Sequence, residues 1–527
     1  MLIDAREILS PTEYHCDYCI VGAGVAGIIL ANELRRTKKG KKIILLEAGG
    51  DKYELSSQKL YRAQSYTKWF PDPTGSRLRM LGGSCNIWEN STERLDPIDF
   101  EKRPWVPDSG WPIHYSELLR FYPMAEQYCG VGSDGFEIKD VLPDSNIENI
   151  CQGSSNLLPS IVKRAIPITH FFKKYGKDLI DSEHVEVIKY ASLTDIEFNT
   201  ESSDVEKVIF QYSPNIKNSI KAKNTILCMG GIENARFMLL ANEKYNNQLG
   251  NKGDNVGRYF MEHPTVRAAH FYPINGKKLP SAYTTGLIQN ARNLHFRLKI
   301  TEQAQRNFEA NNLRFYFTPK TREDLSDGIS SAHILKDSLS NGRVADNFGE
   351  HISHVLGDLD LIIDSFSEDI FDLSITDKDD EFSGYQIISM IEQTPDRNSK
   401  IVLGADKDVF NNNFVDIKWI LSESDKRQTW KSLEILAQDA GLSAWGRIRL
   451  LPEREERIWG SQLGFGQHHI GTTKMSDSGN DGVVDKDCKV FGTKNLYILG
   501  SSVFPTGGHV PPTLTIAALS LRLAATL

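Results

Sequence analysis

Three glycines near the amino terminus have the spacing of a site that holds a dinucleotide. Gly22, Gly24 and Gly27 form the pattern G-x-G-x-x-G between a short apolar run and a helical pattern. The first glycine permits a tight turn, the second lets backbone approach a pyrophosphate, and the third lets the helix pack closely on its strand. Glu47 follows Gly27 at about the 20-residue spacing at which a carboxylate can accept a hydrogen bond from a ribose hydroxyl. The pattern predicts a dinucleotide site but does not separate FAD from NAD.

The elements that must position this site follow from the surrounding pattern. Residues 18–21 and 42–46 are apolar runs that predict buried strands, and residues 28–34 predict a helix between them. The N-terminus of that helix would present free N–H groups and the positive end of its dipole to the phosphates. Residues 225–231 show a second transition from strand to helix, typical of the same kind of domain.

The chain of 527 residues is long enough for two or three lobes. Residues 385–391 and 414–421 alternate apolar and polar side chains, as strands of an antiparallel sheet do, while residues 335–373 have a more helical, acidic pattern. We therefore expect an α/β fold with a discontinuous Rossmann-like domain and an inserted substrate domain built on an antiparallel sheet plus helices. The predicted ranges are 12–100, 185–274 and 461–527 for the cofactor domain, 101–184 for a connecting cap region, and 275–460 for the substrate domain.

Composition excludes several classes of protein. The formal net charge of −8 argues against a general nucleic-acid binder, and no run of about 18 apolar residues predicts a membrane span. The amino terminus shows no export signal, and the 7 cysteines are scattered, so we expect a cytoplasmic protein. Cys16 and Cys19 spell C-x-x-C within a predicted strand and lack a second ligand pair, so no metal site is expected.

Motifs spread along the chain resemble those of the glucose–methanol–choline (GMC) oxidoreductase family. The motifs are AGG at 48–50, MLGGSCNIW at 80–88, DPIDF at 96–100, SGWPI at 109–113, CMGGIENAR at 228–236, NVGRYFMEHP at 255–264, HHIGTTKM at 468–475 and GSSVFPT at 500–506. They cover most of the predicted cofactor domain in order. Within the family, the motifs are most similar to those of the bacterial sugar and polyol dehydrogenases and the pyranose oxidases. The resemblance implies that the dinucleotide is FAD rather than NAD.

The resemblance also implies which residues surround the FAD. It places Gly82, Gly83, Ser84 and Asn86 against the flavin and pyrophosphate, where only bare backbone can lie close to a planar ring. Ile87 stands where covalently flavinylated pyranose oxidases carry histidine, so we expect non-covalent FAD. The full set of predicted cofactor-binding residues is Gly22, Gly24, Ala26, Gly27, Glu47, Ala48, Gly82, Gly83, Ser84, Asn86, Ile87, Gly230, Gly500, Ser501, Pro512 and Thr513.

The resemblance places the catalytic base at His468, in the pattern His-x-x-Gly-Thr. Oxidising an alcohol by hydride transfer requires a base for the hydroxyl proton, and a neutral imidazole suits that role near pH 7. The family's second catalytic residue is replaced by Pro511, which has neither a side-chain donor nor an N–H. We predict His509 as its substitute. We interpret His469 as a packing residue or a partner that supports the base, and His263 as a structural residue below the cofactor.

These residues predict an oxidoreductase that transfers hydride from a hydroxyl-bearing carbon to flavin N5. The expected substrate is a sugar, glycoside, polyol or similar small alcohol, and the electron acceptor is oxygen, a quinone or a redox protein. Two alternatives stay open: a flavin-containing lyase similar to the hydroxynitrile lyases of the family, and a non-catalytic FAD-binding relative. A nicotinamide-linked dehydrogenase explains less, because that class does not account for the carboxy-terminal motifs. The sequence does not indicate the particular substrate, the acceptor or the oligomeric state.

Overall fold

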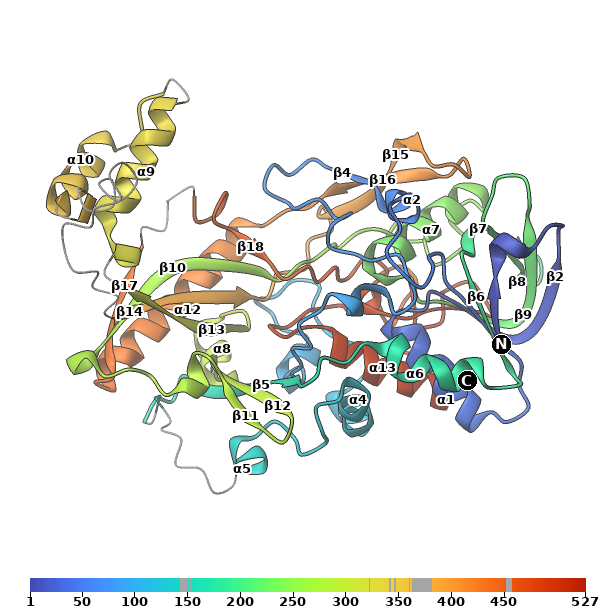
Figure 1. Ribbon diagram of the computed structural model, residues 1–527, viewed down its shortest axis with the longest axis horizontal. Coiled ribbons are helices and arrows are strands. Elements are labelled where there is room, and N and C mark those ends of the chain that lie inside the picture. Colours follow the sequence, from blue (N-terminus) through green and yellow to red (C-terminus); the bar gives the residue numbers. More distant parts are fainter. Residues whose placement is uncertain are drawn as a thin grey trace.

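The computed structural model describes residues 1–142, 150–151, 153–321, 323–340, 343–345, 347–359, 361–362, 382–451 and 457–527. Within these residues the chain forms two large β-sheets and one small sheet. The molecule is elongated, with the first sheet towards one end and the second towards the other (Figure 1). The two chain termini lie near each other beside the first sheet (Figure 1).

The first sheet is mostly parallel and has the strand order β1-β6-β3-β2-β9-β8-β7, with β19 beside β9. Its strands are β1 (Leu2–Asp4), β2 (Glu13–Val21), β3 (Ile43–Leu46), β6 (Val185–Lys189), β7 (Ser192–Asn199), β8 (Asp204–Gln211), β9 (Asn218–Leu227) and β19 (Leu496–Ile498). Every residue of β3 is buried, which is typical of a parallel strand that is covered on both faces.

Helices cover this first sheet. The principal ones are α1 (Val25–Thr37), α6 (Phe171–Ile180), α7 (Gly230–Lys244) and α13 (Thr513–Thr526). Residues 26–34 of α1 are all buried, because α1 lies between the sheet and its neighbouring helices α13 and α6. The predicted strand–turn–helix–strand order is present, with α1 joining β2 to β3.

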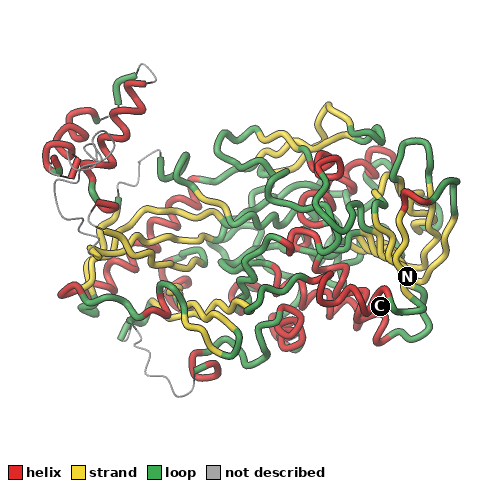
Figure 2. The backbone as a smooth tube through the Cα atoms, viewed as in Figure 1, coloured by secondary structure: helices red, strands yellow, loops and turns green. Residues whose placement is uncertain are grey.

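The second sheet is antiparallel, with the order β11-β12-β13-β14-β10-β17, β5 beside β12 and β18 beside β10. Its strands are β5 (Leu157–Ala165), β10 (Pro264–Pro273), β11 (Leu287–Gln289), β12 (Arg292–Ile300), β13 (Leu313–Thr321), β14 (Phe382–Ile391), β17 (Gly446–Leu450) and β18 (Gly464–Phe465). One face buries apolar side chains such as Phe296, Phe315 and Ile387. Figure 2 shows these long strands between the helices of this lobe and the loops at the centre of the molecule.

The remaining elements are smaller. Strands β15 (Lys400–Lys407), β16 (Asn413–Lys418) and β4 (Ala63–Ser65) form the third sheet. Helices α9 (Asp327–Ser340) and α10 (Phe348–Gly357) pack on each other and project from the second-sheet end (Figure 1). The other helices are α2 (Leu55–Gln58), α3 (Tyr115–Leu119), α4 (Tyr122–Cys129), α5 (Ile138–Val141), α8 (Glu302–Phe308) and α12 (Glu423–Leu442).

The architecture confirms the predicted fold class, with a Rossmann-like lobe and an antiparallel substrate lobe. Strand β14 contains the predicted strand 385–391, whereas β16 ends at Lys418, short of the predicted 421. The predicted helical segment 335–373 contains part of α9 and all of α10, but residues 341–342, 346, 360 and 363–373 lie outside the described residues. The second sheet extends beyond the predicted domain range 275–460, because β5, β10 and β18 pair with its strands.

All 7 cysteines are buried, and none of them forms a disulfide bond within the described residues. Cys16 and Cys19 both lie on β2. Among the described residues, no cluster of three or more His, Cys, Asp or Glu side chains is arranged to hold a metal ion. Within the same ranges, each helix is too short or too polar to cross a bilayer.

A buried ion pair joins the cap region to the second sheet. Arg103 donates from Nη1 and Nη2 to the two carboxylate oxygens of Glu392, at 2.8 Å and 2.5 Å, and both side chains are fully buried. Replacing Glu392 by alanine would leave a guanidinium charge unpaired in the core. We expect Glu392→Ala to lower the free energy of unfolding by about 3–5 kcal/mol.

Urea denaturation measures this effect, and Glu302→Ala is the matched control. Glu302 pairs with Arg306 at the surface, where such a pair contributes about 0–1 kcal/mol. Equal unfolding midpoints for the two variants would show that the buried pair does not stabilise the fold.

Candidate functional site

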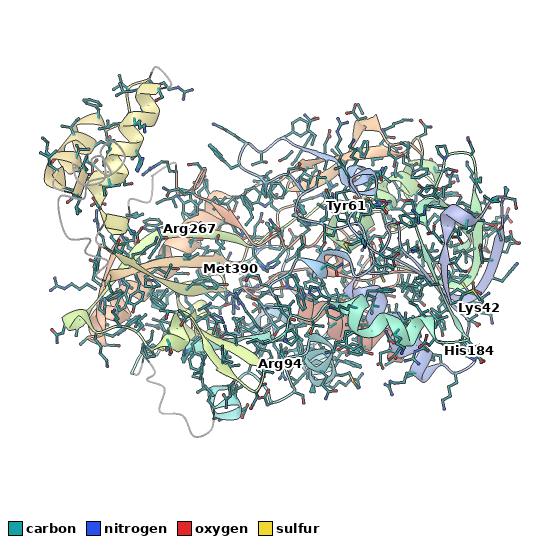
Figure 3. All side chains as sticks on the ribbon, in the orientation of Figure 1. Lys42, Tyr61, Arg94, His184, Arg267 and Met390 are labelled. Carbon is teal, nitrogen blue, oxygen red and sulfur yellow. The ribbon has the colours of Figure 1, made fainter. Side chains whose placement is uncertain are left out.

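A cavity of about 730 Å³ lies at the carboxyl ends of β2, β3 and β9 and reaches the second sheet. Val21, Leu46 and Cys228, at the ends of these three strands, line it. Ligands of open α/β sheets bind in this position, outside the carboxyl ends of the strands. Figure 3 shows two lining residues, Arg267 and Met390, on the second-sheet side and a third, Tyr61, towards the first sheet.

The glycine turn has the geometry that its pattern predicts. Gly22 has φ +105°, and a Cβ there would lie 2.6 Å from the carbonyl oxygen of Cys228. A Cβ on Gly27 would lie 2.0 Å from the carbonyl oxygen of Gly22, so the helix could not pack at this distance. A Cβ on Gly24 would meet no protein atom within 4 Å and would enter the cavity. Helix α1 begins at Val25 without a side-chain cap, which leaves its N–H groups available to phosphate oxygens.

Glu47 lies at the end of β3, lines the cavity and is buried. Its carboxylate accepts hydrogen bonds from the backbone N–H of Ala23 at 3.0 Å and of Gly49 at 2.9 Å. Burial raises the pKa of this carboxyl group above its usual range. Glu47 therefore fixes the turns after β2 and β3, and its contact with a ribose stays a prediction.

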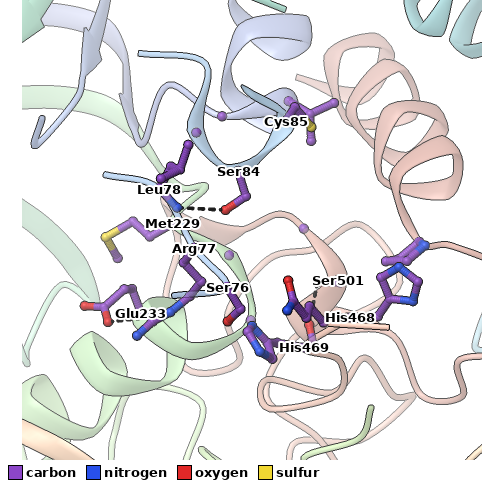
Figure 4. A pocket seen from close by; sticks show the side chains of 18 of the residues that line it. Ser76, Arg77, Leu78, Ser84, Cys85, Met229, Glu233, His468, His469 and Ser501 are labelled. Carbon is purple, nitrogen blue, oxygen red and sulfur yellow. Dashed lines mark hydrogen bonds and ion pairs between the residues drawn. The ribbon is translucent and has the colours of Figure 1, made fainter. Parts of the chain in front are cut away.

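The segment 82–87 covers another wall of the cavity. The Asn86 side-chain amide donates to the carbonyl oxygens of Leu81 at 3.0 Å and Gly83 at 2.9 Å, which closes the loop on itself. The Ser84 hydroxyl oxygen accepts from the backbone N–H of Leu78 at 3.2 Å. Figure 4 shows Leu78 and Ser84 across the cavity from His468, His469 and Ser501.

Most of the predicted cofactor-binding residues meet at this cavity. Those that line it are Gly22, Gly24, Ala26, Glu47, Ala48, Gly83, Ser84, Ile87, Gly230, Gly500, Ser501, Pro512 and Thr513. Gly27, Gly82 and Asn86 lie behind its surface and shape the two turns. A Cβ on Gly230, like one on Gly24, would meet no protein atom within 4 Å, so bare backbone faces the cavity at both glycines. These residues fit a pyrophosphate and a flat ring system.

His468 lines the cavity and forms a hydrogen bond with His263 that the sequence did not indicate. The two Nδ1 atoms are 2.8 Å apart, and His263 Nε2 lies 2.9 Å from the carbonyl oxygen of Gly508. A carbonyl oxygen only accepts, so His263 Nε2 carries hydrogen and its Nδ1 is the acceptor. His468 Nδ1 must then be the donor, which leaves His468 Nε2 as an unprotonated base.

Both imidazole rings are neutral near pH 7. Burial, followed by the charge of Arg314, lowers the pKa of His263 to about 3. Burial and His263 lower the pKa of His468 well below its usual value. Glu262 holds the backbone of both histidines, because its Oε1 accepts from the N–H of His263 at 2.8 Å and of His468 at 2.5 Å.

The other two histidines of the carboxy-terminal motifs lie differently. His469 lines the cavity and packs its ring against Phe260, with centroids 5.8 Å apart. His509 is fully buried, does not line the cavity, and places Nε2 3.3 Å from a carboxylate oxygen of Asp96. A catalytic role for His509 stays a prediction that this position does not support. Pro511 lines the cavity in place of the family's polar residue.

A second group of lining residues was not indicated by the sequence. Glu233 binds Arg77 at 2.9 Å and Arg236 at 3.2 Å, and Arg236 also binds Asp408 at 2.7 Å. All four line the cavity. Glu233 and Arg236 lie in the motif at 228–236, but their partners Arg77 and Asp408 are far away in the sequence, so no local pattern could reveal the pairing.

Comparison with known proteins matches part of the chain to a family model. Residues 395–520 match the family model described as GMC oxidoreductase. The chain carries a GMC oxidoreductase domain. The predicted resemblance is thereby confirmed, and the protein is an FAD-dependent oxidoreductase.

Among curated relatives, the fructose dehydrogenase large subunit of Gluconobacter japonicus is 23% identical over 594 aligned positions, which cover 96% of this chain and 97% of the relative. The oxygen-dependent choline dehydrogenase of Vibrio vulnificus is 34% identical over 133 residues, or 22% of this chain. A solved structure of formate oxidase from Aspergillus oryzae, a variant studied for FAD modification, superposes with a TM-score of 0.56 at 15% identity, covering 98% of each chain. The structural likeness shows the fold.

A side chain at position 24 is expected to displace the cofactor without unfolding the enzyme. Gly24→Leu adds a side chain that enters the cavity, because no protein atom lies within 4 Å of the added Cβ. The variant should fold, shown by an unchanged circular dichroism spectrum, but contain less than about a tenth of the wild-type FAD by absorbance. Gly441→Leu on the surface of α12, also open within 4 Å, is the control. Full FAD content in Gly24→Leu would contradict the assignment of this cavity.

Two substitutions of His263 test whether its Nδ1 accepts a hydrogen bond from His468. Asparagine places its amide oxygen near the position of Nδ1, whereas glutamine extends beyond it. We expect His263→Asn to keep flavin reduction by substrate within about tenfold of wild type and His263→Gln to lose about 10²-fold, because misplacing a base by about 1 Å has that effect. Stopped-flow absorbance measures both rates. Equal rates for the two variants would show that the contact does not orient His468.

Proposed function

We propose that this enzyme oxidises a hydroxyl group of a sugar, glycoside, polyol or similar alcohol, with His468 as the general base. The observation that carries the proposal is the hydrogen-bond chain from Gly508 O through His263 to His468, which leaves His468 Nε2 unprotonated at the cavity. Bound FAD supplies a hydride acceptor at N5. His468 Nε2 would take the hydroxyl proton from the same carbon that gives up the hydride.

The protein surroundings favour this role over a structural one. A neutral imidazole can accept a proton at pH 7, and the pKa of His468 is lowered chiefly by burial. Glu262 fixes the backbone of His468 through the N–H at 2.5 Å, so the ring is held at both backbone and Nδ1. A ring held at two points keeps a constant direction towards a bound hydroxyl group.

Non-covalent attachment of FAD is part of the proposal. Ile87 lines the cavity at the position of the attachment histidine of pyranose oxidases. Burial raises the pKa of the nearby Cys85 thiol to about 12, so this lining cysteine stays protonated and is a poor nucleophile. Helix α13 begins at Thr513 without a side-chain cap, and its positive end faces the cavity that would hold the flavin.

The electron acceptor that we propose is oxygen, a quinone or another redox protein. The fructose dehydrogenase relative is described as a large subunit, which favours keeping a partner protein among the acceptors. The test below therefore uses the reductive half of the reaction, which needs no acceptor.

Anaerobic mixing with a panel of sugars and polyols tests the proposal. We expect at least one to bleach the yellow flavin. His468→Ala should keep its FAD and bleach about 10²–10⁴-fold more slowly, since it lacks the base. His15→Ala, whose side chain is 69% exposed on β2, is the control.

Two results would contradict the proposal. If His468→Ala reduced the flavin at the wild-type rate, His468 would not be the general base. If the flavin kept its colour with every alcohol, the lyase alternative, in which the flavin stays oxidised, would be favoured.

A further inference from the structure

The wall of the cavity that faces away from the first sheet is rich in arginine. Arg164 on β5, Arg267 on β10 and Arg314 on β13 line the cavity, and Tyr316 and Met390 lie among them. Arg297, on the adjacent strand β12, contacts Tyr316 of this wall. Its guanidinium carbon lies 4.4 Å from the centroid of the Tyr316 ring. Antiparallel register explains the arrangement, because side chains directly opposite one another share a face of the sheet.

Carboxylates neutralise only part of this charge. Arg164 pairs with Glu89 at 2.7 Å and Arg314 pairs with Glu93 at 2.9 Å. Among the described residues, neither Arg267 nor Arg297 has a carboxylate partner; Arg267 makes one long hydrogen bond, 3.3 Å, to the carbonyl oxygen of Gln462. The wall therefore carries more positive than negative charge.

Arg314 is built into the wall but not fully satisfied. It is 2% exposed, its Nη1 binds Glu93, and its Nη2 lies 3.2 Å from the sulfur of Met390. Its Nε–H is buried and has no hydrogen-bond partner in the described part of the chain. Arg314 also lines the cavity, so its guanidinium charge lies close to a ligand bound there. The low local dielectric strengthens its attraction for an anion.

The excess charge also affects neighbouring groups. Burial and the charges of Arg314 and Arg164 lower the pKa of Arg297 to about 10, even though Tyr316 and Glu93 act in the opposite sense. The charge of Arg314 contributes to the lowered pKa of both His263 and His468, so Arg314 lies near the proposed base. An anionic group bound to Arg314 would thus lie in the same cavity as His468.

We propose that the substrate carries a carboxylate or phosphate group besides its reacting hydroxyl, and that Arg267 and Arg314 bind this anionic group. The inference rests on the proposed oxidation of an alcohol and narrows its substrate class to hydroxylated acids and phosphorylated polyols. Guanidinium groups bind both kinds of anion through paired N–H donors, so the shared chemistry is a small oxyanion.

Pairs of substrates that differ in charge test the proposal. Anaerobic flavin reduction is measured with D-glucose, D-gluconate and D-glucose 6-phosphate, and with glycerol, glycerate and glycerol 3-phosphate. We expect at least one anionic member to have kcat/KM at least about tenfold above its neutral partner, and this preference to shrink in about 0.5 M NaCl. The carboxylate and phosphate members distinguish the two sources of the oxyanion. A preference for the neutral member in both sets would overturn the proposal.

The arginine variant gives a second, independent measurement. Arg267→Gln should lower the ratio of anionic to neutral kcat/KM by about 10–100-fold, the usual effect of losing a charge-assisted hydrogen bond. Arg306→Gln, on the surface of α8, is the matched control and should leave the ratio unchanged. An unchanged ratio in Arg267→Gln would show that this arginine serves the flavin or the fold instead.

Binding without turnover separates this inference from the proposed function. Malonate and inorganic phosphate are titrated into the oxidised holoenzyme, and the flavin absorbance is followed. We expect at least one to perturb the spectrum with a Kd that is at least about tenfold weaker in Arg267→Gln. Oxidation of neutral sugars with no anion binding would overturn the inference and leave the proposed function standing. Anion binding that depends on Arg267, without oxidation of any alcohol, would overturn the proposed function and leave the anion site standing.

Discussion

The contact between two imidazole rings that lie about 200 residues apart in the sequence depends on the pairing of β10 with β18 in the second sheet. His263 comes immediately before β10, and His468 follows β18, which pairs with β10 at Pro264 and Thr265. This pairing brings the two Nδ1 atoms to 2.8 Å, and the 2.9 Å contact of His263 Nε2 with the carbonyl oxygen of Gly508 joins the pair to the carboxy-terminal loop. A single carboxylate, Glu262, ties both backbone segments to this arrangement. The protonation state of the base is thus a property of the tertiary fold.

Positive charge lies on both sides of the cavity. Uncapped N-termini of α1 and α13 supply positive potential on the first-sheet side, and arginines supply it on the second-sheet side. Between them, His468 stays neutral because its surroundings are buried and already positive. The cationic wall accordingly has two effects: it attracts an oxyanion, and it disfavours a proton on the base.

Local sequence patterns predicted the local features. The glycine turn, Glu47 and the helix after Gly24 follow from short-range spacing, and β14 follows from alternation. The pairing of β5 with β12 joins strands more than a hundred residues apart, so no periodicity could show that the second sheet extends beyond the inserted range. His509 lies near Pro511 in sequence, but the turn at Gly507 and Gly508 directs its ring towards Asp96. Strand alternation shows which residues share a face of the second sheet, but not which face lines the cavity. The arginine wall therefore could not be predicted from the sequence.

The burial of all the cysteines bears on how long the enzyme can work. Burial raises the pKa of Cys16, Cys85 and Cys151 to about 12, and that of Cys19 well above its usual value. Peroxide attacks thiolates rather than thiols, so side chains of this kind react slowly. The proposed acceptors include oxygen, whose two-electron reduction would give hydrogen peroxide in the cavity that Cys85 lines. A chain whose sulfhydryl groups remain protonated and shielded would tolerate its own by-product over many cycles.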